Sequence, residues 1–183
     1  MTTRTDYAHE QVFEHVTPDL ALEAERFWER CGAIPRADER RRRASELAAI
    51  VRDHNGHLAG VGTAYRDILE TGDGALEVFM YRTFIDAAQR KPLLFASLFS
   101  TACAALEKAA PDGRPSHVAF VTENQKFTRP GVVSKTFQSN ALRLVGRDPR
   151  GLQIWAYPLH WDGPHRRPFP GAKAPSNVGP HPL

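Results

Sequence analysis

The sequence predicts an α/β protein of the α+β type, with a mixed, mostly antiparallel sheet flanked by helices and one parallel strand–helix–strand crossover. Three observations indicate this fold. An Asn55-Gly56 pair, a strong hairpin signal, separates two strand-like runs. A nearly continuous apolar strand at 75–85 precedes an apolar helical run at 92–108. A strand at 116–122 completes the crossover, which is expected to be right-handed and to make its two strands parallel.

The first part of the chain predicts a short strand followed by two helices. Residues 1–9 are expected to be frayed, and alternating apolar and polar side chains predict a strand over 12–16. The Thr-Pro pair at 17–18 marks a helix start, because Thr serves as an N-cap and Pro is favoured at the first helical position. Gly32 supplies the left-handed stop of this helix, and a second helix is expected over 37–46.

An antiparallel hairpin follows the helices. Residues 48–52 are expected to form its first strand, residues 54–57 its turn and residues 58–69 its return strand. Gly60 and Gly62 interrupt the return strand, which indicates a bulge or a close approach of the backbone to another group.

The last third of the chain predicts a helix, two strands and a tail. A short helix is expected over 132–140, and strands over 142–145 and 152–157 are joined by a glycine-containing turn. Prolines without any periodic pattern then predict an extended or disordered segment. The sequence therefore predicts one folded domain, residues 1–158, and a proline-rich C-terminal tail, residues 159–183.

Composition limits the classes of function. The chain has 183 residues, 42% of them hydrophobic, which is enough for one core, and its net charge of +3 is too small to indicate nucleic-acid binding by itself. The two cysteines, Cys31 and Cys103, form neither a disulfide framework nor a metal motif, so no metal site is expected. With no signal-peptide pattern and no long apolar run, the sequence predicts a cytoplasmic protein that does not enter a membrane.

The junction between the strand at 75–85 and the helix at 92–108 is the best candidate for a functional site. A basic loop, Asp86 to Pro92, leads from the strand into the start of the helix. Backbone N–H groups and the positive end of the helix dipole converge at such a point and favour phosphate groups. The loop lacks the glycines that these sites usually carry, so a solvated loop is the alternative interpretation.

Across roughly residues 10–158 the order of elements resembles the GNAT superfamily of acyl-CoA-dependent N-acyltransferases. The resemblance rests on the hairpin AIVRDHNGHLAGVGTAY before the central strand and on the ending KTFQSNALRLVGRDPRGLQIWAYPL. It implies a GNAT-like fold in which the central strand splays away from its neighbour. The free backbone groups of that strand would pair with the pantetheine arm of acetyl-CoA or another acyl-CoA, the expected co-substrate.

The resemblance also implies the residues that bind the cofactor. The superfamily pattern Gln/Arg-x-x-Gly-x-Gly/Ala falls on the segment 89–94, where Pro92 and Leu94 replace the two small residues. No tyrosine lies between Tyr81 and Tyr157 to match the superfamily's usual general acid. The implied cofactor-binding residues are Phe84, Ile85, Gln89, Arg90, Lys91, Leu93, Leu94 and Asn124.

Three residues of the central strand are candidates for catalysis and substrate binding. Glu77 is the candidate general base, and its alternative role is that of an exposed strand residue. Tyr81 and Arg82 are candidates for binding the substrate, including an anionic group of it. The alternatives are cross-strand packing for Tyr81 and an ion pair of Arg82 with Asp67 or Glu70.

The preferred hypothesis is an acyl-CoA-dependent N-acyltransferase that transfers an acetyl or other acyl group to an amine of a small molecule or protein. The alternative is a catalytically inactive GNAT-like binding module. A third hypothesis, nucleic-acid binding through Arg40 to Arg43, is weaker, because no aromatic residues interleave with the arginines and such a run usually forms a solvated helix face. An amine acceptor is the expected partner, and a homodimer formed through the sheet edge is compatible with the pattern.

Overall fold

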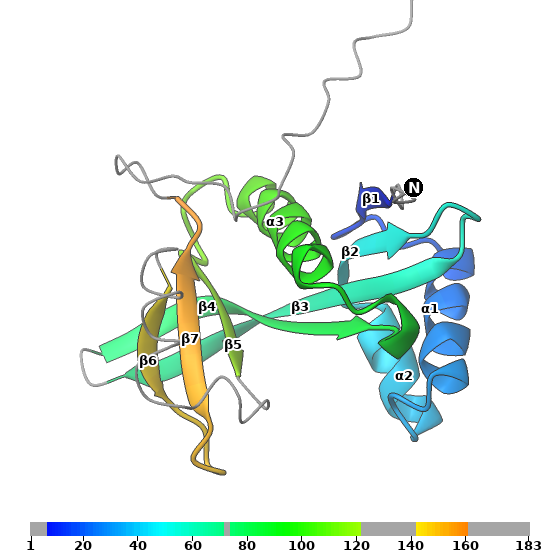
Figure 1. Ribbon diagram of the computed structural model, residues 1–183. Helices are drawn as coiled ribbons and strands as arrows, with labels where there is room; N and C mark the ends of the chain where they lie inside the picture. Colours follow the sequence, from blue (N-terminus) through cyan, green and yellow to red (C-terminus); the bar gives the residue numbers. More distant parts are fainter. Residues whose placement is uncertain (1–6, 72–73, 122–141, 161–183) are drawn as a thin grey trace, which may run out of the picture.

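A computed structural model describes residues 7–71, 74–121 and 142–160. Within these residues seven strands form one sheet in the order β1-β2-β3-β4-β5-β7-β6 (Figure 1). All neighbouring strands are antiparallel except β4 and β5, which are parallel. The strands are β1 (Ala8–Gln11), β2 (Leu47–Arg52), β3 (Leu58–Thr71), β4 (Gly74–Ile85), β5 (His117–Val121), β6 (Arg143–Arg147) and β7 (Gln153–Pro158).

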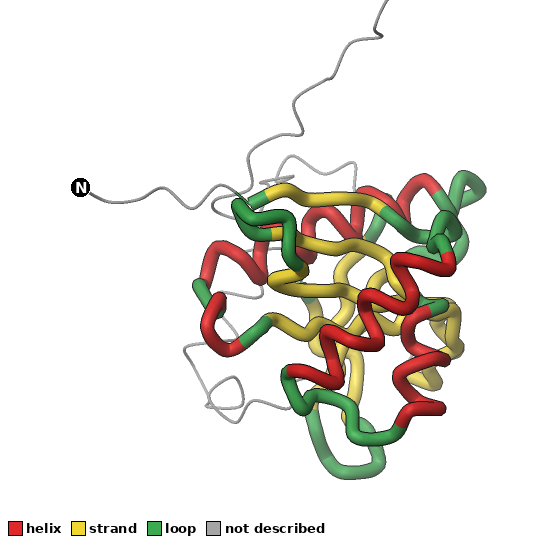
Figure 2. The backbone as a smooth tube through the Cα atoms, turned by 90° about the vertical axis from the view of Figure 1, so that its right-hand side faces the viewer, coloured by secondary structure: helices red, strands yellow, loops and turns green. Residues whose placement is uncertain are grey.

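Helices cover the two faces of the sheet. Helix α3 (Pro92–Lys108) packs on one face, and α1 (Pro18–Arg30) and α2 (Ala37–Ala44) lie together on the other, at the end formed by β1 to β3 (Figures 1 and 2). The chain therefore has the mixed, mostly antiparallel fold with one parallel crossover that the sequence predicts. The predicted helix 132–140 and the tail beyond residue 160 lie outside the described residues. Among the described helices, none is both long and apolar enough to cross a membrane.

The start of α1 forms as the sequence predicts. Thr17 has an extended backbone, and its hydroxyl accepts a hydrogen bond of 3.2 Å from the N–H of Leu20, one of the first N–H groups that the helix itself cannot satisfy. Gly32, just after the helix, has a φ of +62°, the left-handed conformation that glycine adopts at no steric cost. Phe27 and Trp28 are buried against the sheet.

The predicted strand over 12–16 is wrong. The first strand is instead β1, which pairs with β2 from Ala8↔Arg52 to Gln11↔Ala49. Beyond Gln11 the chain turns: the N–H of His15 bonds to the carbonyl of Val12, and Glu14 has a φ of +63°. The apolar residues of this segment still point inward, which explains the alternation, but they do so from a turn.

Gly62 on β3 provides the close approach that its position predicts. Tyr81 of β4 is 2% exposed and lies on the α3 face, with its ring edge-on to Phe99 at 5.2 Å. A Cβ placed on Gly62 would stand 2.5 Å from the Tyr81 hydroxyl oxygen and 2.8 Å from its ring carbon Cε2. Only glycine at this position leaves room for the ring.

We expect Gly62→Ala to lower the free energy of unfolding by about 1–3 kcal/mol, because the added methyl group overpacks the site and displaces the Tyr81 ring. Urea denaturation measures the change. Gly146→Ala is the matched control, since Gly146 is also in a strand and a Cβ there meets no atom within 4 Å. Equal stability of the two variants would contradict the prediction.

Candidate functional site

Strands β4 and β5 separate part of the way along their length. Their parallel pairing covers three positions, from Val78↔His117 to Met80↔Ala119. Beyond Met80, β4 continues to Ile85 and pairs only with β3, while β5 continues to Val121 and pairs only with β7. Figure 1 shows β5 and its neighbours running across the direction of β3 and β4. The β5-facing edge of β4 from residue 81 to residue 85, called here the free edge, is thus without a strand partner among the described residues.

An aromatic cluster fills the α3 side of this divergence. Phe99 of α3 is buried and makes edge-on contacts with Tyr81 of β4, Phe120 of β5 and Tyr157 of β7, with ring centroids 5.2, 5.9 and 5.9 Å away. Phe95, one helical turn earlier, stacks on Phe99 and is 38% exposed. The cluster therefore links α3 to both diverging strands and reaches the surface at the first turns of α3.

The free edge leads directly into the basic loop. Asp86 follows β4, and its carboxylate accepts a hydrogen bond from the N–H of Ala88 at the start of a short 3₁₀ helix (Ala87–Gln89). The side chain of Arg90 folds back, and its Nε donates to the carbonyl oxygen of Ile85 at 3.1 Å. Helix α3 begins at Pro92, and no side chain caps it. The positive end of the helix dipole thus lies beside two cationic residues, Arg90 and Lys91.

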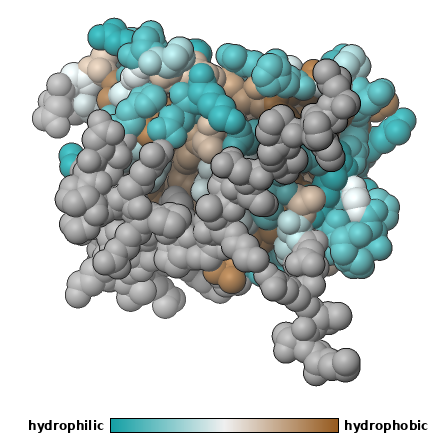
Figure 3. Space-filling view, turned by 90° about the horizontal axis from the view of Figure 1, so that it is seen from above, coloured by the Kyte–Doolittle hydropathy of each residue, from teal (hydrophilic) through white to brown (hydrophobic). Residues whose placement is uncertain are grey.

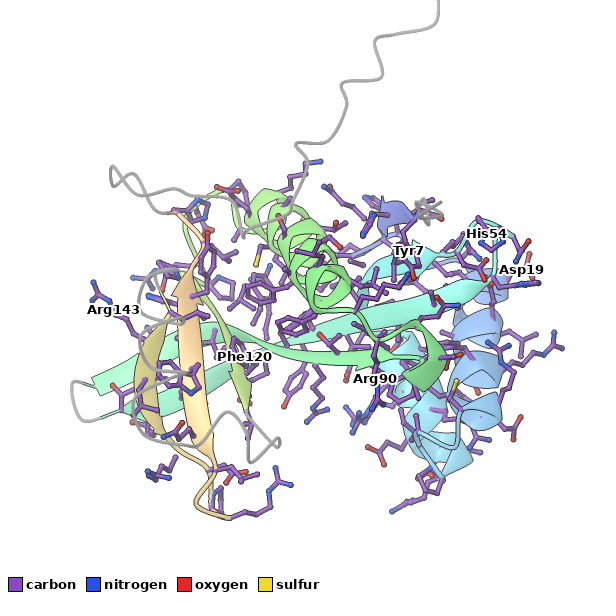
Figure 4. The ribbon with its side chains drawn as sticks, viewed as in Figure 1. Tyr7, Asp19, His54, Arg90, Phe120 and Arg143 are labelled. Atoms are coloured by element: carbon purple, nitrogen blue, oxygen red, sulfur yellow. The ribbon has the colours of Figure 1, made fainter. Side chains whose placement is uncertain are left out.

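Tyr7, just before β1, and His9 within it hold this loop and α3 in place. The Tyr7 hydroxyl donates to Gln89 Oε1 at 2.8 Å, and the Lys91 ammonium group lies 5.7 Å from the centre of the Tyr7 ring. His9 Nε2 lies 2.8 Å from the hydroxyl oxygen of Ser97 in α3. Figure 4 shows Tyr7 and Arg90 at the α1 end of the sheet, whereas Phe120 and Arg143 lie in the other half.

The predicted cofactor residues lie largely together. Four of them lie around the start of α3: Gln89, Arg90, Lys91 and Leu93. The side chain of Leu93 is 60% exposed. The remaining apolar ones belong to the core: Ile85 and Leu94 are buried, and Phe84 packs edge-on against Phe27 of α1. On the face seen from above, hydrophobic surface lies between hydrophilic side chains (Figure 3). Asn124 lies outside the described residues.

The structure does not bring Glu77 to the loop. Glu77 lies near the start of β4, eight residues before Ile85, which corresponds to about 26 Å along an extended strand. Its side chain is 48% exposed, and its carboxylate lies 3.6 Å from the guanidinium group of Arg114. Its role as a general base stays a prediction, and this exposed position matches the alternative interpretation of an outward-facing strand residue.

The two other strand candidates lie on opposite faces of β4. Tyr81 packs into the core beneath α3, and burial raises the pKa of its hydroxyl group, so that the neutral form persists at physiological pH. Arg82 lies on the other face, and its guanidinium group is stacked 5.1 Å from the centre of the Tyr65 ring. The expected ion pair of Arg82 with Asp67 or Glu70 is absent among the described residues, because the register places Asp67 opposite Val78 and Glu70 opposite Ala75.

The arginine run on α2 is largely neutralised. Arg40 pairs with Glu29 at 2.8 Å, Arg42 with Glu46 at 2.6 Å and Arg43 with Glu39 at 2.5 Å. The Arg40 guanidinium also donates to two backbone carbonyls at the end of the preceding loop. Carboxylates at i,i+4 spacing therefore pair with Arg42 and Arg43, and a carboxylate of α1 pairs with Arg40, which fits a structural role better than a nucleic-acid surface.

Tyr7, Phe99 and Phe120 are site residues that the sequence analysis did not identify. Tyr7 lies in the segment that was expected to be frayed, yet Tyr7, His9 and Gln11 all bond to the segment 89–108. Their two-residue spacing is a strand signal that could have placed them on one face. No group of His, Cys, Asp and Glu side chains in the described part of the chain could hold a metal ion.

No family model matches the chain, and no curated protein matches its sequence. Solved structures do match its fold. A GNAT-family acetyltransferase from Streptococcus pneumoniae is 14% identical, with a TM-score of 0.56 over 84% of this chain and 99% of the other. A putative GNAT acetyltransferase from Desulfovibrio desulfuricans is 12% identical, with a TM-score of 0.54 over 85% and 100%. AtaT in complex with acetyl-methionyl-tRNAfMet is 14% identical, with a TM-score of 0.54 over 84% and 95%. The chain therefore has a GNAT fold.

His117 is the first residue of β5, at the paired end of the β4–β5 contact. Burial, with a smaller contribution from the charge of Arg143, lowers the pKa of His117 below its ordinary value. The folded protein thus binds fewer protons than the unfolded chain in the range just below pH 6.5, and its free energy of unfolding falls as the pH drops from about 7 towards 5. His9, whose pKa burial also lowers, contributes in the same direction.

We expect His117→Gln to reduce this pH dependence, and the double variant with His9→Gln to reduce it further. Denaturation midpoints measured between pH 7.5 and 5 test the effect. His54→Gln, in the exposed turn of the β2–β3 hairpin, is the control and should leave the slope unchanged. A wild-type slope that persists in the double variant would refute the assignment.

Proposed function

We propose that this chain is an acyl-CoA-dependent N-acyltransferase that transfers an acetyl or other acyl group to an amine. The observation that carries the proposal is the free edge of β4, which has no strand partner among the described residues and runs into a basic loop and a helix start without a side-chain cap. Backbone groups along such an edge are able to pair with an extended ligand, as an added strand would. The GNAT fold supports the same assignment.

The residues present fit a CoA thioester. The free edge would pair with the amide groups of the pantetheine arm, and Arg90 and Lys91 at the start of α3 would bind the pyrophosphate through charge-assisted hydrogen bonds. Pro92 has no N–H group, so the helix start offers one donor fewer than a glycine loop would. The two cationic side chains therefore carry a larger share of phosphate binding here.

The bound CoA thioester supplies the activated acyl group. The contribution of this chain is to hold the amine and the acyl carbon together, which removes much of the entropic barrier of a bimolecular reaction. N–H groups of the free edge would polarise the acyl carbonyl. Glu77 stays the proposed proton acceptor, and Asn124 stays a proposed cofactor ligand.

A second candidate is a GNAT-like module that binds a partner without catalysis. It is favoured by one observation: polar groups of the loop already have partners within the chain, since Arg90 bonds to Ile85 and Gln89 to Tyr7. AtaT is recorded with an acetylated aminoacyl-tRNA, but the ion pairs of α2 give no support for a nucleic-acid acceptor in this chain.

We expect acetyl-CoA to bind the wild-type protein with micromolar affinity, and Arg90→Glu combined with Lys91→Glu to weaken binding by about 100-fold or more. The estimate follows from the loss of two charge-assisted contacts, each contributing about 1.5–3 kcal/mol. Isothermal titration with acetyl-CoA, CoA and a longer acyl-CoA measures it.

The matched control for this charge reversal is Arg26→Glu with Arg41→Glu, at exposed positions of α1 and α2. It makes the same change in net charge away from the loop and should leave acetyl-CoA binding nearly unchanged. If the wild type binds none of the three ligands, the enzyme proposal fails and the binding module remains. If it binds CoA but acylates no amine, the module is likewise favoured.

We expect Tyr7→Phe to weaken CoA binding by about 3- to 10-fold. The substitution removes only the hydroxyl group that fixes Gln89, which corresponds to about 0.5–1.5 kcal/mol for one hydrogen bond. Gln89→Leu removes the same bond from the other side, so the double variant should bind as weakly as the weaker single variant. Additive losses would show that Tyr7 acts through another contact.

A further inference from the structure

Arg82 has no carboxylate partner among the described residues, although its side chain is partly buried. Arg40, Arg42, Arg43 and Arg52 each pair with a glutamate. Arg82 instead donates from Nη2 to the Tyr65 hydroxyl at 3.2 Å, and its Nη1 is buried with no hydrogen-bond partner in the part of the chain that the structure describes. A buried donor of a charged group that lacks an acceptor carries a substantial free-energy cost.

The position of Arg82 connects it with the proposed active site. It is the second residue of the free edge, two positions beyond the last β4–β5 pair at Met80. Its side chain lies on the face opposite α3, between two separate hydrophobic clusters. One cluster contains Phe84 and packs under α1 and α2, and the other contains Met80 and packs against β5 and β7. Arg82 is thus a positive charge at the boundary of two apolar regions.

Tyr65 orients this charge. The guanidinium group lies 5.1 Å from the centre of the Tyr65 ring and also bonds to its hydroxyl, so two contacts restrict its rotation. The hydroxyl accepts from Arg82 and retains its own proton, which it can donate to the same ligand. An oxygen ligand beside Nη1 would therefore meet a preorganised pair of donors.

We propose that Arg82, oriented by Tyr65, binds a carboxylate group of a substrate of acyl transfer. The inference rests on the proposed function. One guanidinium charge matches a carboxylate better than a phosphate group, which carries about −1.5 to −2 charges. The carboxylate has two sources: the acyl group of a dicarboxylic acyl-CoA such as succinyl-CoA, or an acceptor that is an amino acid. In either case it provides the acceptor that Nη1 lacks.

The test has two arms, one for each source. The first compares titrations of acetyl-CoA and succinyl-CoA into the wild type and Arg82→Gln. The second arm measures CoA release from acetyl-CoA in the presence of each common amino acid. The same assay is run with the matching amine that lacks the carboxyl group. We expect Arg82→Gln to weaken succinyl-CoA binding, or to lower kcat/KM for an amino acid, by about tenfold or more. Acetyl-CoA binding and the reaction of the plain amines should fall much less than these carboxylate-dependent readouts.

Arg66→Gln is the matched control. Arg66 is also stacked on an aromatic ring, 5.1 Å from the centre of Phe79, but it lies on the opposite face and donates to the backbone carbonyls of Ala109 and Arg114. The same charge is removed, and carboxylate recognition should not change. The thermal unfolding midpoint of Arg82→Gln should equal or exceed that of the wild type. A loss of carboxylate binding in this variant would then not be due to misfolding.

The outcomes distinguish this inference from the function on which it rests. A wild type that binds no CoA rejects the proposed function and the inference together. A wild type that binds CoA, yet shows no dependence on Arg82 in either arm, rejects the inference alone. A loss confined to the first arm assigns the carboxylate to the acyl group, and a loss confined to the second assigns it to the acceptor.

Discussion

The edge-on packing of Phe99 against Tyr81, Phe120 and Tyr157 is the interaction on which the site depends. These three rings come from β4, β5 and β7, so one helical side chain fixes the positions of strands on both sides of the divergence. Parallel strands usually continue to pair while both are extended, because unpaired backbone groups carry a cost. Here the ring of Phe99 contacts side chains on both strands near the point where β4 and β5 part, so the divergence is part of the core packing.

Under the proposed function, the basic loop would be a second way to order a phosphate-binding segment. A glycine-rich loop brings backbone N–H groups close to the ligand, whereas this loop begins its helix with Pro92 and relies on side chains. Those side chains are positioned by contacts within the chain, from Tyr7 to Gln89 and from Arg90 to the end of β4. Preorganised cations lose less conformational entropy on binding. This advantage requires that the Tyr7–Gln89 and Arg90–Ile85 hydrogen bonds persist when the ligand is bound.

Local signals in the sequence predict most of the fold. The features that they mispredict depend on the register between strands that are far apart in the sequence. The Thr17 cap, the Asn55-Gly56 turn and the crossover around α3 are encoded within a few neighbouring residues, and all three form as predicted. The position of β1 depends on pairing with β2, about 40 residues away, so a local alternation placed it wrongly. The predicted ion pair of Arg82 with Asp67 or Glu70 does not form among the described residues, because strand register determines which residues face each other.

Whether an arginine is paired with a carboxylate is a better guide to its role than whether it lies in a cluster of arginines in the sequence. The run on α2 is conspicuous in the sequence, yet helical spacing brings glutamates to Arg42 and Arg43, and their charges stabilise the fold locally. Arg43 also has a buried nitrogen without an acceptor, Nε, but its guanidinium group pairs with Glu39. Arg82 is a single cation in an apolar strand, and among the described residues its buried Nη1 has no acceptor and its charge has no carboxylate partner. A fold tolerates such a cost where binding recovers it, which is why uncompensated groups concentrate at functional sites. By this reasoning the isolated charge beside the free edge indicates substrate recognition more strongly than the dense cluster on α2.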